Sequence, residues 1–215
     1  MGSQIKDLVR NLFQSFKENP QNFFSEREIH CLFWEKAKDA FGSAPAREGV
    51  KAIRLLRHEY ESVWRYKRKN KFKEKYSNEG STAAFDFVVL KKSFVESNDH
   101  LTVVNKDEPK RRSLRNLDGI FDLVIEFKMA HHRNQGKITQ SQEDAYLRDM
   151  ILDARKCAQE KPGTAVIIGL SHGPRPDKAG MERIYSEIQA EFSKYNPNGK
   201  ILVFLTNSKD DFGDF

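Results

Sequence analysis

The sequence is poor in cysteine and has no long apolar run, and each shortage excludes a class of protein. Its 215 residues include two cysteines, Cys31 and Cys157, too few for a disulfide framework or a cysteine metal cluster. Both have apolar neighbours in helical patterns, so buried free thiols are expected. No stretch approaches the roughly 20 apolar residues of a membrane span. The N-terminus lacks a hydrophobic signal core, so a cytoplasmic, reducing setting without membrane contact is expected.

Charge of one sign is concentrated in a short stretch. Lys and Arg outnumber Asp and Glu by 37 to 31, which gives a net charge of +6. Residues 65–75 (RYKRKNKFKEK) contain seven basic residues and one acid, so this run alone carries +6. Such a patch attracts a polyphosphate chain and releases its counterions. The alternative is an ordinary solvated basic strand or loop.

Helices are predicted where apolar residues recur every three or four positions. Residues 4–18 have this spacing, and Pro20 ends the helix. Ser25 and Glu28 form a capping-box pattern that predicts the start of a second helix, which extends to about Phe41. Two longer helices are expected at 141–159 and 177–195, with a break at 42–48 and an undecided segment, helix or strand, at 50–56.

Strands are predicted where apolar residues alternate or form short continuous runs. The strongest is residues 120–129 (IFDLVIEFKM), which is apolar on both faces, as is typical of a central strand. A meander of strands followed by strand–helix–strand units predicts an α/β fold, with a mixed central sheet flanked by helices. The other expected strands are 60–66, 83–90, 164–170, 200–206 and a short edge strand at 100–104, with a polar loop at 105–116 and a loose acidic tail.

The residues that stand out are charged side chains inside apolar strands. Asp86 lies within AAFDFVVL, and Glu126 and Lys128 lie within LVIEFKM. Burial of an unpaired charge costs several kcal/mol, so these charges should meet one another, a metal ion or a ligand. Glu126 and Lys128 are two residues apart, so both side chains leave the same face of their strand. If the two strands are neighbours, Asp86 can lie beside Glu126.

Two carboxylates and a lysine on one face suit metal-assisted hydrolysis. Carboxylate oxygens suit Mg²⁺ or Mn²⁺. Such an ion holds a phosphodiester oxygen and lowers the pKa of a water molecule. The lysine ammonium can orient that water or neutralise charge that develops on phosphorus. The sequence therefore predicts hydrolysis by in-line attack of water.

An aspartate on one strand followed by Glu-x-Lys on the next resembles the PD-(D/E)xK nuclease superfamily. Phe85 stands where the motif has proline, and the segment between Asp86 and Glu126 is long. Residues 25–30 (SEREIH) are similar to the family's helix motif, with Glu26 the better match and Glu28 the alternative. Further similar pieces are Glu59-Tyr60 at the first strand and Gln142-x-x-x-Tyr146 on the helix after the lysine strand.

This resemblance implies a restriction-endonuclease-like core of order αβββαβ at residues 25–215. Residues 1–24 would be an N-terminal helical extension, and a strand and helix would extend the C-terminal side. The implied function is a Mg²⁺- or Mn²⁺-dependent nuclease acting on DNA in preference to RNA, with dimerisation an open option. Without activity, the fold would be a nucleic-acid-binding or protein-interaction module.

The resemblance also implies roles for individual residues. Metal ligands would be Asp86, Glu126, the main-chain carbonyl of Phe127 and Glu26, while Lys128 acts on water or phosphorus. Supporting residues would be Gln142, Tyr146 and Glu28. His131 and His132, which follow the lysine strand, could contact phosphate. The basic run and the basic loop, independently of the resemblance, predict further phosphate contacts at Arg65, Lys67, Arg68, Lys69, Lys71, Arg111 and Arg112.

Each of these residues also has an ordinary structural interpretation. Glu126 and Lys128 could form a cross-strand ion pair, and Asp86 could face solvent. Glu26 in a first helical turn is favoured by the helix dipole in any protein. Gln142 and Tyr146 are common residues on a helix surface.

Overall fold

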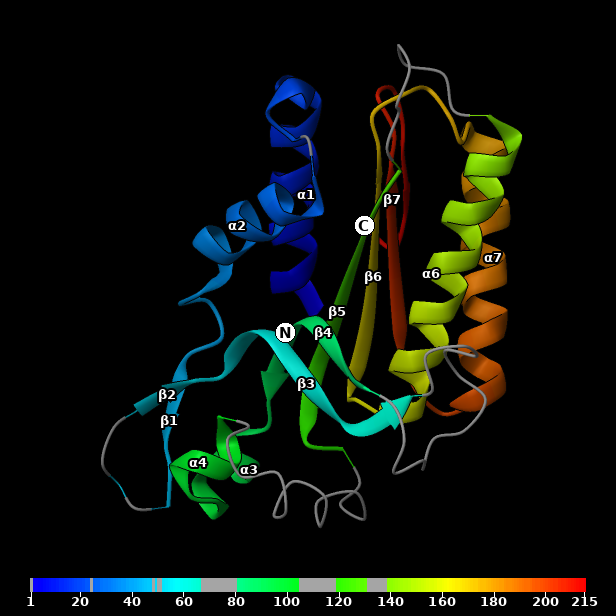
Figure 1. The fold of residues 1–215 in the computed structure, drawn as a ribbon. Coiled ribbons are helices and arrows are strands. Elements are labelled where there is room, and N and C mark those ends of the chain that lie inside the picture. Colours follow the sequence, from blue (N-terminus) through cyan, green and yellow to red (C-terminus); the bar gives the residue numbers. More distant parts are fainter. Residues whose placement is uncertain are drawn as a thin grey trace.

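In this computed structural model the core of the chain is a mixed six-stranded sheet with helices on both faces (Figure 1). The structure describes residues 2–23, 25–47, 49, 52–66, 81–104, 119–130 and 139–215. The strand order is β3-β4-β5-β6-β7-β8. The strands are β3 (Leu56–Tyr66), β4 (Ser81–Leu90), β5 (Phe121–Ala130), β6 (Thr164–Ser171), β7 (Ile201–Thr206) and β8 (Asp211–Gly213).

The sheet combines an antiparallel half and a parallel half. The pairs β3–β4, β4–β5 and β7–β8 are antiparallel. The pairs β5–β6 and β6–β7 are parallel, so a helix crosses the sheet between their strands. This agrees with the predicted meander followed by strand–helix–strand units.

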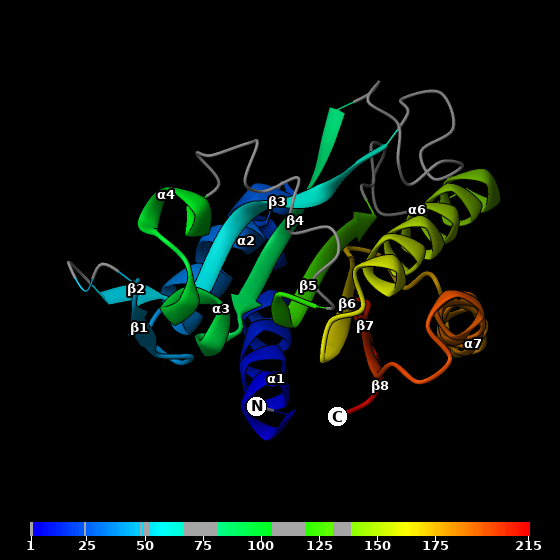
Figure 2. The ribbon, with the colours of Figure 1, turned by 90° about the horizontal axis from the view of Figure 1, so that it is seen from below.

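Helices cover the two faces in pairs. α6 and α7 lie together on one face, and α1 and α2 lie on the other (Figures 1 and 2). Because both faces are covered, the central strands β6 and β7 are almost wholly apolar, and β5 is apolar apart from Asp122, Glu126 and Lys128. The helices are α1 (Gly2–Glu18), η1 (Pro20–Asn22), α2 (Glu26–Ala37), α3 (Lys92–Ser97), α4 (His100–Val103), α6 (Gln140–Glu160) and α7 (Lys178–Tyr195).

Capping residues mark the start of three helices, and only the cap at Ser25 was predicted from the sequence. The capping box at Ser25 is present, with Glu28 Oε2 accepting the Ser25 N–H at 2.7 Å. Thr139 and Gln142 form a second capping box at α6. Asp177 caps α7 through the Gly180 N–H at 2.9 Å.

One continuous hydrophobic core joins the elements. Phe13 and Phe16 on α1 belong to it together with Phe87, Phe127 and the central strands. The helix at the N-terminal end therefore shares the core of the sheet, because its apolar stripe is buried against it.

The predicted edge strand at 100–104 is wrong. His100–Val103 forms helix α4, since the Asp99 side chain accepts the Thr102 N–H at 2.9 Å and caps it. Helix α3 precedes it and was not predicted. Of the undecided segment 50–56, Ala52–Arg54 forms β2 and Leu56 begins β3, while residues 50 and 51 lie outside the described residues.

Three further expectations need correction. The expected break at 42–48 contains β1 (Ser43–Pro45), which pairs with β2. The expected loose tail adds β8 to the sheet, where Asp214 Oδ2 accepts the Val203 N–H. Cys31 is exposed, whereas Cys157 is buried as expected.

No helix among the described residues combines the length and the apolar character needed to cross a membrane. The predicted polar loop at 105–116 lies outside the described residues.

Candidate functional site

The site lies where β4 and β5 separate. Their hydrogen-bonded register runs from Leu90 opposite Phe121 to Phe87 opposite Ile125, and Asp86 is the next residue of β4. Asp86 Oδ2 accepts the main-chain N–H of Phe127 at 2.7 Å. The carboxylate thus takes the place of a strand carbonyl at this point. We call this opening, formed by Asp86 and residues 126–129, the fork.

Glu26 approaches the fork from α2. As the first residue of the helix, it follows the capping box, which holds Glu28 at Ser25. The Met129 N–H hydrogen-bonds to the Glu26 carboxylate. Of the two acids that the sequence offered for this helix, Glu26 reaches the fork and Glu28 caps the helix. Burial raises the pKa of Glu26, and the nearby ammonium of Lys128 offsets only part of that rise.

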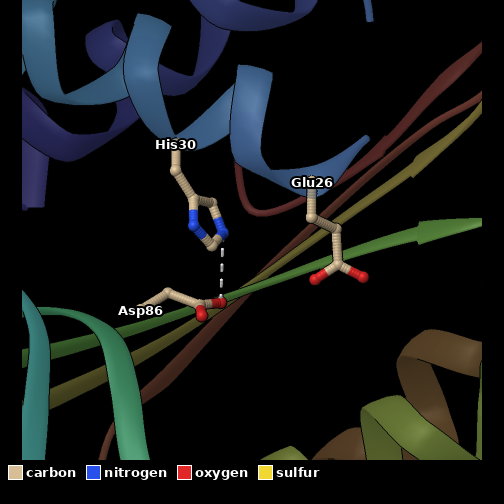
Figure 3. A group of neighbouring side chains, drawn as sticks. All are labelled: Glu26, His30 and Asp86. Atoms are coloured by element: carbon tan, nitrogen blue, oxygen red, sulfur yellow. Dashed lines mark ion pairs between the residues drawn. The ribbon is translucent and has the colours of Figure 1, made fainter. Parts of the chain in front are cut away.

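The His30 imidazole lies next to the carboxylates of Glu26 and Asp86. One ligand atom each from Glu26, His30 and Asp86 can be chosen so that all three lie within 4.8 Å of one another. Figure 3 shows the glutamate and the imidazole leaving α2 towards the aspartate below them. His30 Nε2 lies 3.5 Å from Asp86 Oδ2, and His30 Nδ1 lies 3.5 Å from His58 Nε2.

Packing fixes the His30 ring in this position. The ring is 9% exposed and contacts Phe87 and Phe127 at centroid distances of 5.6 and 5.4 Å. Burial opposes the charge on Asp86, but the His30 ring and the Phe127 N–H hold the pKa of Asp86 below its ordinary value. Asp86 is therefore poised as an anion beside the imidazole.

Lys128 lies between two acids on different helices. Its Nζ is 3.2 Å from Asp153 Oδ2 on α6 and 3.7 Å from Glu26 Oε2 on α2. Burial disfavours its charge, yet Asp153 and Glu26 outweigh that effect and raise the pKa of Lys128. Lys128 is therefore a fixed cation at the edge of the fork.

Glu126 is held on the α6 side by Lys156. The two side chains form an ion pair through Glu126 Oε1 and Lys156 Nζ, and the two residues are 2% and 7% exposed. Lys156 Nζ also lies 3.5 Å from Asp153 Oδ1 and donates to the Ala84 carbonyl at 3.2 Å. Burial raises the pKa of Glu126, with Lys156 opposing and Asp86 adding to the rise. Glu126 and Lys128 both contact α6, as their two-residue spacing predicts.

These contacts form a chain of alternating charges. It runs from Glu26 through Lys128, Asp153 and Lys156 to Glu126. Together with Asp86 the cluster has four carboxylates and two ammonium groups, which leaves two negative charges when all are ionised. A divalent cation would balance them, and two carboxylates with one imidazole form a donor set that suits such an ion.

A hollow of about 300 Å³ opens beside Lys128. We call it the Lys128 hollow. Glu26, Lys128, Gln142 and Tyr146 are among its lining residues, so four predicted site residues meet there. Gln142 also holds the Thr139 N–H in the α6 capping box. Burial raises the pKa of Tyr146, which keeps its hydroxyl protonated at neutral pH.

The predicted phosphate-binding residues are not described by the structure, apart from the backbone of Arg65. That residue lies on β3 opposite Thr82. Those outside the described residues are Lys67, Arg68, Lys69, Lys71, Arg111, Arg112, His131 and His132.

The sequence analysis missed His30, Asp153 and Lys156. His30 follows Glu26 by four residues, so both share one face of α2, and that spacing could have indicated it. Asp153 and Lys156 lie on the buried side of α6, between Met150 and Cys157. Charged residues at positions that helical spacing assigns to the core are the available signal.

No family model matches the chain, and neither curated proteins nor solved structures provide a match.

Proposed function

We propose that this protein is a metal-dependent nuclease that hydrolyses phosphodiester bonds in nucleic acid, with DNA as the expected substrate. The observation that carries the proposal is the convergence of Glu26, His30 and Asp86 within 4.8 Å beside Lys128. The two carboxylates of this group repel each other, and a divalent cation held between them would remove that repulsion.

The order of elements supports a restriction-endonuclease-like core. α2, β3, β4, β5, α6 and β6 follow one another in the order αβββαβ that the resemblance implies. α1 would be the extension before this core, and α7 and β7 the extension after it. Asp86 on the second core strand and Glu126 and Lys128 on the third keep their expected order.

In this proposal Glu26, His30 and Asp86 hold a divalent cation, Mg²⁺ or Mn²⁺. The imidazole favours Mn²⁺, since nitrogen ligands suit transition metals better than Mg²⁺. The Phe127 carbonyl points to the same side of β5 as its N–H, which faces Asp86, so it is available as a further ligand. Glu126, expected from the sequence as a ligand, instead supports the site through Lys156.

Lys128 is the residue best located to act on the reacting groups. A bound divalent cation would supply Lewis acidity at the phosphate and lower the pKa of a water molecule. The Lys128 ammonium orients that water or neutralises charge that develops on phosphorus. Water attacks in line, the bond from phosphorus to the leaving oxygen breaks, and no covalent bond to the enzyme forms. The attacking water releases one proton to solvent, and the leaving oxygen takes up one proton from solvent.

The test is cleavage of labelled single- and double-stranded DNA with Mg²⁺ or Mn²⁺. The native protein should cut, and Lys128→Ala should cut roughly 10²–10³-fold more slowly, as for loss of a group that stabilises the transition state. Lys92→Ala is the matched control, since Lys92 is an exposed lysine on α3 paired with Glu96. Absence of cleavage with either ion, or full activity in Lys128→Ala, would refute the proposal.

One observation favours a second candidate, a nucleic-acid-binding module without activity. The buried Glu126–Lys156 ion pair occupies a carboxylate that the resemblance assigns to the metal. A binding module would bind DNA in a salt-sensitive manner, unchanged in Lys128→Ala, without cutting it.

A further inference from the structure

A second hollow, of about 660 Å³, lies farther along α2. We call it the Trp34 hollow. Its walls come from α2 and the turn that follows it, the β1–β2 hairpin, the start of β3 and α4. Its volume lies within the range of about 300–1,000 Å³ typical of small-molecule sites. Trp34, Asp39, Arg54 and Arg57 are among its lining residues.

The Trp34 hollow is connected to the candidate metal group by one face of α2. Glu26, His30 and Trp34 are spaced by four residues, so they follow one another along the helix. At 1.5 Å per residue, Trp34 lies about 12 Å from Glu26 along the axis. The Phe87 ring links the two regions, with centroids 5.6 Å from His30 and 6.4 Å from Trp34. A strand with one phosphate at the fork could therefore reach the hollow within a few nucleotides.

The lining of the Trp34 hollow combines an aromatic face with cations. Trp34 is partly buried and stacks on Phe87 at an interplanar angle of 17°. Arg54 Nε is 3.1 Å from Asp39 Oδ1, and this pair is largely exposed. Arg57 has no ion pair or hydrogen bond among the described residues, so its guanidinium is available to a ligand.

An aromatic ring beside the unpaired guanidinium of Arg57 suits one class of ligand. Bases stack on aromatic side chains whatever their sequence, and arginine binds phosphate through two parallel hydrogen bonds. We propose that the Trp34 hollow is a subsite for a nucleotide of the substrate strand that flanks the phosphate at the fork. Trp34 stacks on its base and Arg57 contacts its phosphate. This inference rests on the proposed nuclease function.

The test measures how cleavage depends on substrate length. Labelled single-stranded oligonucleotides are extended one nucleotide at a time on either side of the cut. For the native protein, kcat/KM should rise roughly tenfold once the strand reaches the Trp34 hollow, as expected for one stacked base. In Trp34→Ala and Arg57→Ala, the ratio of kcat/KM between the longest and shortest substrates should fall towards one.

Conservative and distant variants make this test specific. Trp34→Phe keeps an aromatic ring and should retain most of the length advantage, which also controls for packing against Phe87. Arg10→Ala removes the same charge on α1, where Arg10 pairs with exposed Asp7, and should leave the length advantage unchanged. If Trp34→Ala and Arg57→Ala keep the native ratio, or lower kcat/KM by the same factor for every substrate length, the subsite is refuted while the nuclease function stands.

A binding measurement shows whether the nuclease function or the subsite at the Trp34 hollow is the proposal that fails. Binding of the same oligonucleotides is followed by fluorescence anisotropy in EDTA, where no cleavage occurs. Arg57→Ala should lower the slope of log K against log salt by about one, as for one lost phosphate contact. If nothing is cut but this slope changes, the Trp34 hollow binds nucleic acid on a protein without nuclease activity. If the slope is unchanged, the hollow does not bind the strand.

Discussion

Two parts of the same sheet satisfy their main-chain groups in different ways. β6 lies between β5 and β7, and strands bond to it along both edges. At the fork, β5 has β6 on one edge, but carboxylates meet the other edge. Asp86 accepts the Phe127 N–H, and Glu26 accepts the Met129 N–H. Because β4 and β5 separate here, main-chain N–H groups that would otherwise bond to a strand carbonyl instead hold the carboxylates of Asp86 and Glu26 in place.

The two parts also differ in what stabilises them. The β6 region is stabilised by apolar burial and leaves little space for added volume. In the fork, buried charges lose hydration, and pairing with opposite charges must compensate for that loss. Substitutions should therefore destabilise the two regions for different reasons. In the β6 region the cause is excess volume, and in the fork it is a buried charge left without its partner.

The largest loss of stability is expected for Lys156→Met. This change leaves Glu126 buried without its cation, so the free energy of unfolding should fall by about 3–5 kcal/mol in urea titrations. The double variant Lys156→Met/Glu126→Leu should recover most of that loss, because no unpaired carboxylate remains at this position. Lys92→Met, at an exposed lysine, should change stability by less than about 0.5 kcal/mol. A cost below about 1 kcal/mol for Lys156→Met would show that the pair is dispensable.

A smaller loss is expected for Gly169→Ala on β6. An added Cβ would lie 2.3 Å from Tyr146 Oη and 2.8 Å from both Leu205 Cδ2 and Met150 Cε. Such overpacking should lower the free energy of unfolding by about 1–3 kcal/mol. Tyr146→Phe should restore part of it by removing the hydroxyl. Gly2→Ala, whose Cβ would lie 4.0 Å from its nearest neighbour, is the control. An unchanged stability in Gly169→Ala would contradict close packing here.

The smallest effect on stability is expected for Asp86→Asn. The amide oxygen can still accept the Phe127 N–H, so the free energy of unfolding should fall by only about 1 kcal/mol. The charge that would hold a divalent cation is lost, however. Mn²⁺ should raise the melting temperature of the native protein and leave that of Asp86→Asn unchanged. An equal rise in both proteins would exclude Asp86 as a ligand.

The sequence predicted the central fold because its strands are continuous apolar runs. Residues 120–129 and 164–170 could hardly be exposed, and capping patterns at Ser25 correctly marked a helix start. The prediction failed at His100–Val103, where a short apolar segment suits either structure and the Asp99 cap decides. The spacing of apolar residues predicts a helix or strand best where the segment is long and buried on both faces, and worst where the whole element is only a few residues long.

The candidate site was only partly predictable. Asp86, Glu126 and Lys128 could be identified because charges inside apolar strands are unusual. That Glu126 pairs with Lys156 depends on how α6 is rotated against β5, which no local pattern specifies. That His30 lies beside Asp86 depends on how α2 is oriented over the fork, which packing against Phe87 and Phe127 determines.

The charge cluster around the fork, which has two net negative charges when all its groups are ionised, also has a kinetic consequence. A polyanion that approaches an ion-free fork meets repulsion at close range, although the chain as a whole is positive. Neutralisation by a divalent ion lowers that barrier, so the strand should associate faster once the ion is bound. Association rates for the strand should then be higher with Mn²⁺ than in EDTA, and bound strand should tighten binding of the ion by the same factor by which the ion tightens binding of the strand.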